Sequence, residues 1–160
     1  MISTKLKIGL DYHGVIDSNP DYFKEFCCYA KSKGHLIYII SGASKVFISD
    51  VLEQLRLPYD YIFSILDYCL ALGYIEQHDN GLIINNLAWN KAKSDFCRRC
   101  NIDLHIDDSD IYLQHFLQPY CLYDNIKKVC QIQNGQIINF NQHPSVAIDS
   151  LVAVIKKPSC

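Results

Sequence analysis

The segment that most constrains this chain is the run from Leu6 to Asp17, which reads Leu-Lys-Ile-Gly-Leu-Asp-Tyr-His-Gly-Val-Ile-Asp. A short apolar stretch ends at Asp11, and Gly14 follows three residues later. A buried strand that stops at an aspartate delivers a carboxylate to the carboxyl edge of a sheet, where ligands of open α/β sheets bind. Gly14 allows the backbone to turn sharply and a ligand to come close. The segment therefore predicts an α/β protein with a polar site at the end of its first strand.

Composition narrows the class of protein. The 160 residues suit a single domain spanning 1–160, and 49% hydrophobic against 20% charged residues excludes a disordered chain. A net charge of −2 gives no strong signal for nucleic acid, and no apolar run approaches the ~20 residues of a membrane span. Eight cysteines without a visible signal peptide favour reduced thiols, and hence a cytoplasmic location.

Apolar runs alternate with helix signals along the chain. Asn19-Pro20-Asp21, for example, combines a capping side chain, a proline and an acidic residue, as expected at a helix start. The expected strands are 6–10, 36–40, 61–65, 104–106 and 120–123, and the expected helices are 19–33, 44–55, 91–100 and 145–156, with a further short helix between 67 and 90. Asp79-Asn80-Gly81 and Asn134-Gly135 signal hairpins. The pattern predicts a Rossmann-like, three-layer α/β domain with a parallel central sheet and two small β-hairpin insertions.

Three of the expected strands end in polar residues: Asp11, Ser41, and the pair Asp107-Asp108. Because parallel strands end at the same edge of a sheet, these groups are expected to converge. Clustered carboxylates repel one another unless a cation lies among them, and oxygen ligands suit Mg²⁺. An aspartate beside such a cation stays ionised and is able to attack phosphorus.

The first of these segments resembles the first motif of the haloacid dehalogenase (HAD) superfamily, usually Asp-x-Asp-Gly-(Val/Thr). Asp11, Gly14 and Val15 match, whereas His13 stands where the motif has its second aspartate. The resemblance continues in Ser41, which is similar to the second motif, and in Lys93, which precedes Asp107 by 14 residues as the lysine of the third motif often does.

Asp107-Asp108 resembles the fourth motif, so four motifs stand in order between Leu6 and Ser109. The resemblance implies a Mg²⁺-dependent phosphohydrolase that acts on a phosphomonoester through an aspartyl-phosphate. Asp11 would be nucleophile and metal ligand, Ser41 with Gly42 and Lys93 would hold the phosphoryl group, and Asp107 or Asp108 would complete the metal site. Residue patterns do not rank the two aspartates, and the resemblance slightly favours Asp107. Lys91 competes with Lys93 for the third motif.

His13 leaves two interpretations open. In active phosphotransferases of the superfamily the second aspartate is the general acid and base, and its backbone carbonyl binds the metal. His13 retains the carbonyl, and an imidazole is also able to exchange protons near neutral pH. The protein is then either a phosphatase with a substitute acid/base, or a catalytically silent module that binds phosphate or a protein partner. Asp17 is a weaker candidate for compensation.

The segments between the motifs are too short for a full cap domain, so the expected site is nearly capless and open. Its substrate is expected to be a phosphorylated small molecule or a nucleotide, and Trp89 is a candidate for stacking on a ring. A second copy of the chain is an alternative means of closing the site. Cys97 and Cys100 have CxxC spacing, but without a second pair they indicate core packing on a helix rather than a zinc site.

Overall fold

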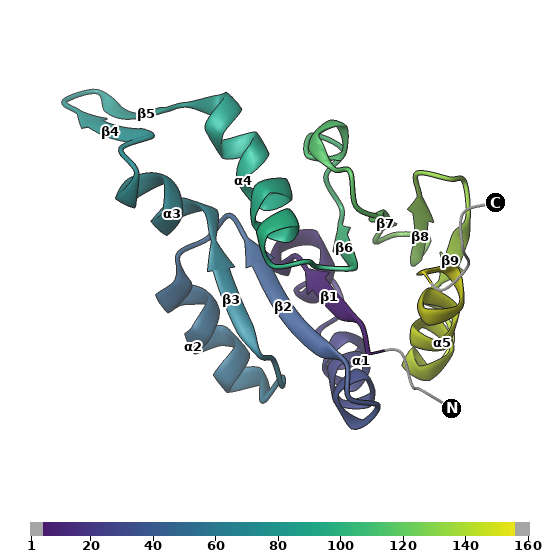
Figure 1. The fold of residues 1–160 in the computed structure, drawn as a ribbon. Coiled ribbons are helices and arrows are strands. Elements are labelled where there is room, and N and C mark those ends of the chain that lie inside the picture. Colours follow the sequence, from purple (N-terminus) through teal and green to yellow (C-terminus); the bar gives the residue numbers. More distant parts are fainter. Residues whose placement is uncertain (1–4, 156–160) are drawn as a thin grey trace.

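The computed structural model describes residues 5–155. Its centre is a seven-stranded sheet in the order β3-β2-β1-β6-β7-β8-β9 (Figure 1). The first five strands in this order run parallel, and β8 and β9 continue the sheet antiparallel. The strands are β1 (Lys7–Leu10), β2 (Leu36–Ser41), β3 (Tyr61–Ser64), β6 (Leu104–Asp107), β7 (Tyr120–Asp124), β8 (Val129–Ile132) and β9 (Ile137–Asn139). The predicted α/β class with a mostly parallel central sheet is confirmed.

Helices occupy both faces of the sheet (Figure 1). They are α1 (Pro20–Ser32), α2 (Lys45–Leu55), α3 (Ile65–Ala71), α4 (Asn86–Arg99) and α5 (Pro144–Ile155), with short turns at η1 (Tyr12–Ile16) and η2 (Leu113–His115). Capping side chains fix the first residues of several helices, because a side-chain oxygen accepts a hydrogen bond from a backbone N–H of the first turn. Asn19 accepts from the N–H of Tyr22, and Ser44 accepts from that of Phe47.

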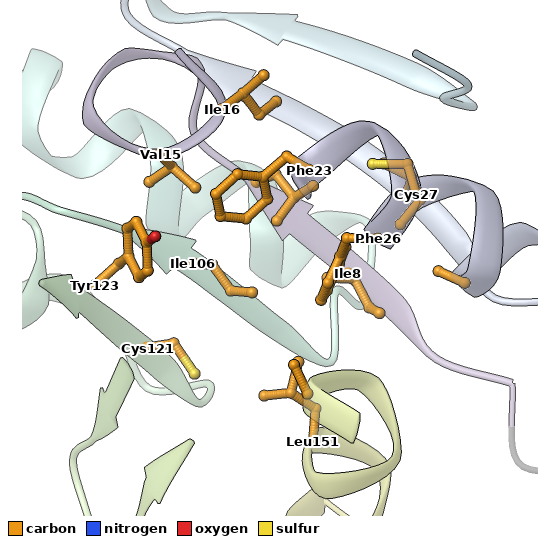
Figure 2. Packing of buried hydrophobic residues seen from close by; sticks show 14 of the residues in the cluster. Ile8, Val15, Ile16, Phe23, Phe26, Cys27, Ile106, Cys121, Tyr123 and Leu151 are labelled. Carbon is orange, nitrogen blue, oxygen red and sulfur yellow. The ribbon is translucent and has the colours of Figure 1, made fainter. Parts of the chain in front are cut away.

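Two buried clusters fill the spaces between the layers. In the first, α1, α2 and α5 pack on one face of the sheet, and Figure 2 shows Phe23, Leu151, Ile8 and Tyr123 meeting there. In the second, α3 and α4 pack on the opposite face, with Phe96 stacked on Phe63 at a ring distance of 4.2 Å. Burial of these apolar faces is the main stabilising contribution to the fold.

Strand alternation explains which residues reach the α4 face. Leu104 and Ile106 of β6 belong to the first cluster, so His105 and Asp107 point to the opposite face. On β1, Ile8 and Leu10 likewise belong to the first cluster, so Gly9 and the following Asp11 lie on the side of α4.

Three predicted boundaries need correction. Helix α4 begins at Asn86 rather than Lys91, because Asn85 caps it by accepting from the N–H of Ala88. Strand β3 ends at Ser64, since Ser64 caps α3 by accepting from the N–H of Asp67. The last helix is Pro144–Ile155, and the predicted end at Lys156 lies outside the described residues.

The two predicted hairpins occupy different places in the fold. Strands β4 (Ile75–His78) and β5 (Gly81–Ile84) form a separate two-stranded sheet that projects beyond α3 and α4 (Figure 1). The turn at Asn134-Gly135 instead joins β8 to β9, which pair onto β7 and extend the central sheet. The hairpin predicted at Asn134-Gly135 is therefore confirmed, but its strands are part of the main sheet and do not form an insertion.

The helices within residues 5–155 include none that is both long and apolar enough to cross a membrane. The seven cysteines in this range are free thiols. Cys97 is fully buried in the second cluster, as core packing on a helix face requires.

Candidate functional site

The carboxylates of Asp11, Asp107 and Asp108 meet at the carboxyl ends of β1 and β6. Each contributes an oxygen that lies within 4.8 Å of an oxygen of the other two. The parallel register makes this meeting possible, because Leu10 pairs with Ile106 and the N–H of Asp11 donates to the Ile106 carbonyl at 2.9 Å. The convergence of the two strand ends thus follows from adjacent parallel strands.

Lys93 reaches this cluster from the second turn of α4. Its ammonium lies 2.6 Å from Asp107 Oδ2 and 3.3 Å from Asp11 Oδ2, and it is 4.4 Å from the centre of the Tyr112 ring. Lys93 is almost fully buried, whereas Lys91 is exposed. Of the two lysines considered from the sequence, the structure therefore places Lys93 among the carboxylates.

Burial and charge together set the protonation of this cluster. Burial raises the pKa of Asp11 from its ordinary 3.8 to about 7, partly offset by Lys93 and reinforced by Asp107. Burial would also raise the pKa of Asp107, but Lys93 and the hydrogen bond from His105 hold it below its ordinary value. The pKa of Lys93 is raised overall, since Asp11 and Asp107 outweigh the effect of its burial. One ammonium thus does not balance the three carboxylates.

The two aspartates of the fourth segment have different surroundings. Asp107 is fully buried, and its Oδ2 accepts from Lys93 and from His105 while its Oδ1 accepts from the N–H of Ser109 at 3.0 Å. Asp108 is exposed and lies against Gly14. A carboxylate offers about four acceptor positions, so Asp107 has little capacity left for a further ligand.

The donor set fits a hard divalent cation. Asp11 supplies a buried carboxylate and Asp108 supplies one that is open to solvent. Mg²⁺ in proteins is usually bound by one or two carboxylates and several water molecules, so this pair suits it. Burial is the main cause of the raised pKa of Asp11, and a bound cation would lower this pKa by favouring the ionised carboxylate. Gly14 leaves the room for this arrangement: its φ is +76°, and a Cβ there would overlap the Asp108 carboxylate.

The turn after β1 carries His13. His13 (φ −71°, ψ 132°) and Gly14 (φ 76°, ψ −11°) have the angles of the two central residues of a type II turn. The His13 Nδ1 lies 3.2 Å from Asp17 Oδ2, and the ring stacks on Phe47. Asp17 Oδ1 also accepts from the N–H of Gly14 at 2.6 Å. Asp17, a weaker candidate from the sequence, is therefore the residue that orients the exposed imidazole.

Ser41 and Gly42 lie at the same edge, at the end of β2. Leu10 of β1 pairs with Ile39 of β2. Asp11 comes one residue after Leu10, and Ser41 comes two residues after Ile39, so both lie near the ends of these neighbouring strands. Ser41 is fully buried, and its hydroxyl accepts from the N–H of Ala43 at 3.2 Å. Gly42 lies against the Trp89 indole: a Cβ added at residue 42 would be 3.4 Å from the indole ring.

Sequence reasoning missed one member of the cluster. His105 is fully buried, with Nε2 2.9 Å from Asp107 Oδ2. The two-residue period of a strand places residues 105 and 107 on one face, and that signal was available in the sequence.

No family model, curated protein or solved structure matches this chain. The geometry alone therefore defines the candidate site. It combines two buried carboxylates, an adjacent buried ammonium and one carboxylate open to solvent, which are the elements needed to bind a cation and to transfer an anionic group.

Proposed function

We propose that this chain is a Mg²⁺-dependent phosphohydrolase of the HAD type that hydrolyses phosphomonoesters. The observation that carries the proposal is the placement of Lys93 Nζ 3.3 Å from the Asp11 carboxylate inside a cluster of three aspartates. An ammonium at this position stabilises negative charge both on the attacking carboxylate and on a phosphoryl group beside it. The four motif-like segments that resemble this superfamily support the same conclusion.

Asp11 is proposed as the nucleophile. Its carboxylate oxygen forms a bond to phosphorus while the bond from phosphorus to the leaving oxygen breaks, which gives an aspartyl-phosphate and an alcohol. A water molecule then attacks the phosphorus, so that inorganic phosphate leaves and Asp11 is regenerated. Lys93, from α4, would hold phosphoryl oxygens throughout, with Ser41 and Gly42 at the neighbouring strand end.

Asp11, Asp108 and the backbone carbonyl of His13 are the proposed ligands of the cation, and Asp107 is assigned mainly to Lys93. Bound Mg²⁺ would neutralise phosphoryl charge and keep Asp11 ionised. This assignment favours Asp108 over Asp107 because Asp107 already accepts three hydrogen bonds.

His13 is proposed as the acid and base. If the ring is protonated and Nδ1–H donates to Asp17, Nε2–H gives its proton to the leaving oxygen, and the neutral Nε2 then takes a proton from the attacking water. The Asp17 carboxylate would fix the tautomer, as a second carboxylate does for many catalytic histidines. The substrate class is a phosphorylated small molecule or nucleotide, reached through a site without a cap domain.

A second candidate is a catalytically silent module that binds phosphate or a protein partner. The observation that favours it is the side chain of His13, which is larger than an aspartate and exposed on the turn. In this case Mg²⁺ and phosphate bind but no ester is hydrolysed.

The test is phosphate release from a panel of phosphomonoesters with and without Mg²⁺. The variants are Asp11→Asn, which removes the nucleophile, and His13→Asp, which installs the aspartate of the resembling motif. Asp50→Asn is the matched control, because Asp50 is an exposed carboxylate of α2 that is not among the proposed site residues.

Three results are informative. Turnover by wild type and Asp50→Asn but not by Asp11→Asn supports the phosphatase. Silence of wild type together with a gain of activity in His13→Asp supports the binding module. Turnover by Asp11→Asn at the wild-type rate contradicts the assigned nucleophile.

A further inference from the structure

His105 occupies a layer that is otherwise apolar and aromatic. Its ring stacks on Phe116 at 5.5 Å with an angle of 10° between the planes, and it meets the edge of Tyr120 at 5.8 Å. A phenylalanine would fill this space equally well. A polar ring buried among apolar groups is costly unless its nitrogen makes a hydrogen bond. The hydrogen bond to Asp107 is therefore the feature that distinguishes histidine here.

The neighbouring strand leaves room for this ring. Gly9 pairs with His105 across β1 and β6, and a Cβ on residue 9 would lie 2.7 Å from His105 Nδ1 and 2.9 Å from Ile40 Cδ1. Both distances are shorter than normal contacts between non-bonded atoms. The histidine thus takes the volume that any larger residue at position 9 would need.

Asp107 is held by three donors that come from separate elements. Lys93 Nζ of α4 is at 2.6 Å and His105 Nε2 of β6 is at 2.9 Å from Oδ2, while the Ser109 N–H is at 3.0 Å from Oδ1. An ionised carboxylate only accepts, so the His105 nitrogen that faces it carries the hydrogen. With both sides of the carboxylate fixed, Lys93 is held between Asp107 and Asp11.

We propose that His105 is a positioning residue of the candidate cation and phosphoryl site. Through its Nε2–H it fixes the orientation of Asp107, which in turn keeps the Lys93 ammonium beside Asp11. This inference rests on the proposed function for its effect on turnover, but its effect on the geometry of the site is independent of turnover. Outer hydrogen-bond partners of this kind change metal affinity or activity by about 10–100-fold when they are removed.

The first experiment measures the tautomer of His105 in the wild-type protein by long-range ¹H–¹⁵N NMR. We expect a hydrogen on Nε2 and none on Nδ1. A neutral ring with its hydrogen on Nδ1 would overturn the proposal, because Nε2 would then be unable to donate to Asp107. This readout does not require the protein to hydrolyse anything.

The second experiment compares three variants. His105→Phe keeps the ring packing and removes the donor, and His105→Gln returns an N–H donor to the same region. His115→Phe is the matched control, since His115 is a half-buried histidine of η2 outside the hydrogen bonds of Asp107. The dissociation constant for Mg²⁺, kcat and KM for an aryl phosphate, and the thermal melting temperature are measured for each.

We expect His105→Phe to weaken Mg²⁺ binding about tenfold and to lower kcat about 10–100-fold with little change in KM. His105→Gln should recover part of the Mg²⁺ affinity and part of kcat, and His115→Phe should match wild type in both. A folded His105→Phe protein with wild-type Mg²⁺ affinity and kcat would overturn the positioning role. If wild type hydrolyses no ester, the phosphatase proposal fails, and the NMR and Mg²⁺ measurements still decide the role of His105. If His105→Phe does not fold, the comparison of His105→Gln with wild type decides it.

Discussion

The Asp11→Asn substitution separates the stability of the fold from the proposed chemistry. Asp11 is 6% exposed, and its carboxylate lies beside Asp107 and 3.3 Å from the ammonium of Lys93. Burial and Asp107 raise its pKa from 3.8 to about 7 despite Lys93. The metal-free fold therefore disfavours the charged form of the residue that the proposed reaction requires to be charged.

The magnitude follows from this pKa. One pKa unit corresponds to about 1.4 kcal/mol, so the ionised Asp11 costs the folded state about 4 kcal/mol above pH 7. Between pH 3.8 and about 7 the unfolded chain has lost this proton while the folded protein retains it. The cost consequently grows as the pH rises through this range and is complete above it.

Asparagine has nearly the same shape and no charge, but its amide nitrogen is unable to accept from Lys93. The loss of that interaction cancels part of the gain, and we expect Asp11→Asn to be more stable than wild type by about 1–2 kcal/mol near pH 8.5. Near pH 5, where wild-type Asp11 is largely protonated, the difference should change by about 3 kcal/mol in favour of wild type, so the advantage of the variant should be lost or reversed.

The assay is urea unfolding in the presence of a chelator at the two pH values. The difference between wild type and variant isolates Asp11, because the other titrating groups are common to both. Asp50→Asn should show no pH-dependent difference. An Asp11→Asn protein that is less stable than wild type near pH 8.5, or a difference that does not vary with pH, would refute the electrostatic reasoning. Added Mg²⁺ should stabilise wild type more than the variant, since ligand binding to the native state adds stability.

Three further substitutions test separate contacts. In Gly14→Ala, alanine would have to adopt a φ of +76°, and its Cβ would overlap the Asp108 carboxylate. We expect the Mg²⁺ affinity, measured by calorimetry, to fall at least tenfold and the free energy of unfolding to fall by about 1–2 kcal/mol. Gly9→Ala should cost about 1–3 kcal/mol in urea unfolding because it overpacks against His105, and adding His105→Ala should recover part of that loss in a double-mutant cycle. Lys93→Met leaves the buried carboxylates of Asp11 and Asp107 without their ammonium, so it should destabilise the chelator-treated protein by about 3–5 kcal/mol. Added Mg²⁺ should restore part of the lost stability, measured in a thermal melt.

Local signals in the sequence predicted most of the parallel half of the sheet. Asn19 and Ser44 cap α1 and α2 at the expected residues, because N-capping depends only on atoms within one turn. The ends of β1, β2 and β6 were also predictable, since an apolar run that stops at a polar residue marks the end of a buried strand. These features need no knowledge of distant contacts.

The start of α4 was harder to predict because two local signals compete. The hairpin signal at Asp79-Asn80-Gly81 led to the prediction that the helix begins only at Lys91, although Asn85 is a good capping residue. Only tertiary structure shows that β5 ends at Ile84, so that Trp89 belongs to the helix. The pairing of β8 onto β7 is likewise a non-local contact that a turn signal does not reveal.

The site divides into a buried part and an exposed part with different structural causes. Asp11, Asp107 and Lys93 are held by two strands and a helix, and each is buried among the others. His13 and Gly14 are the central residues of a type II turn, and the side chain of Asp17, just after this turn, contacts both of them.

This division explains why the fold tolerates different side chains at position 13. The turn presents the side chain of His13 to solvent, so a substitution there leaves the buried ion pairs intact and is expected to change stability by less than about 0.5 kcal/mol. The choice between the two proposed functions, a phosphatase and a silent binding module, therefore depends on the chemistry of one exposed side chain and its partner, and not on the stability of the fold.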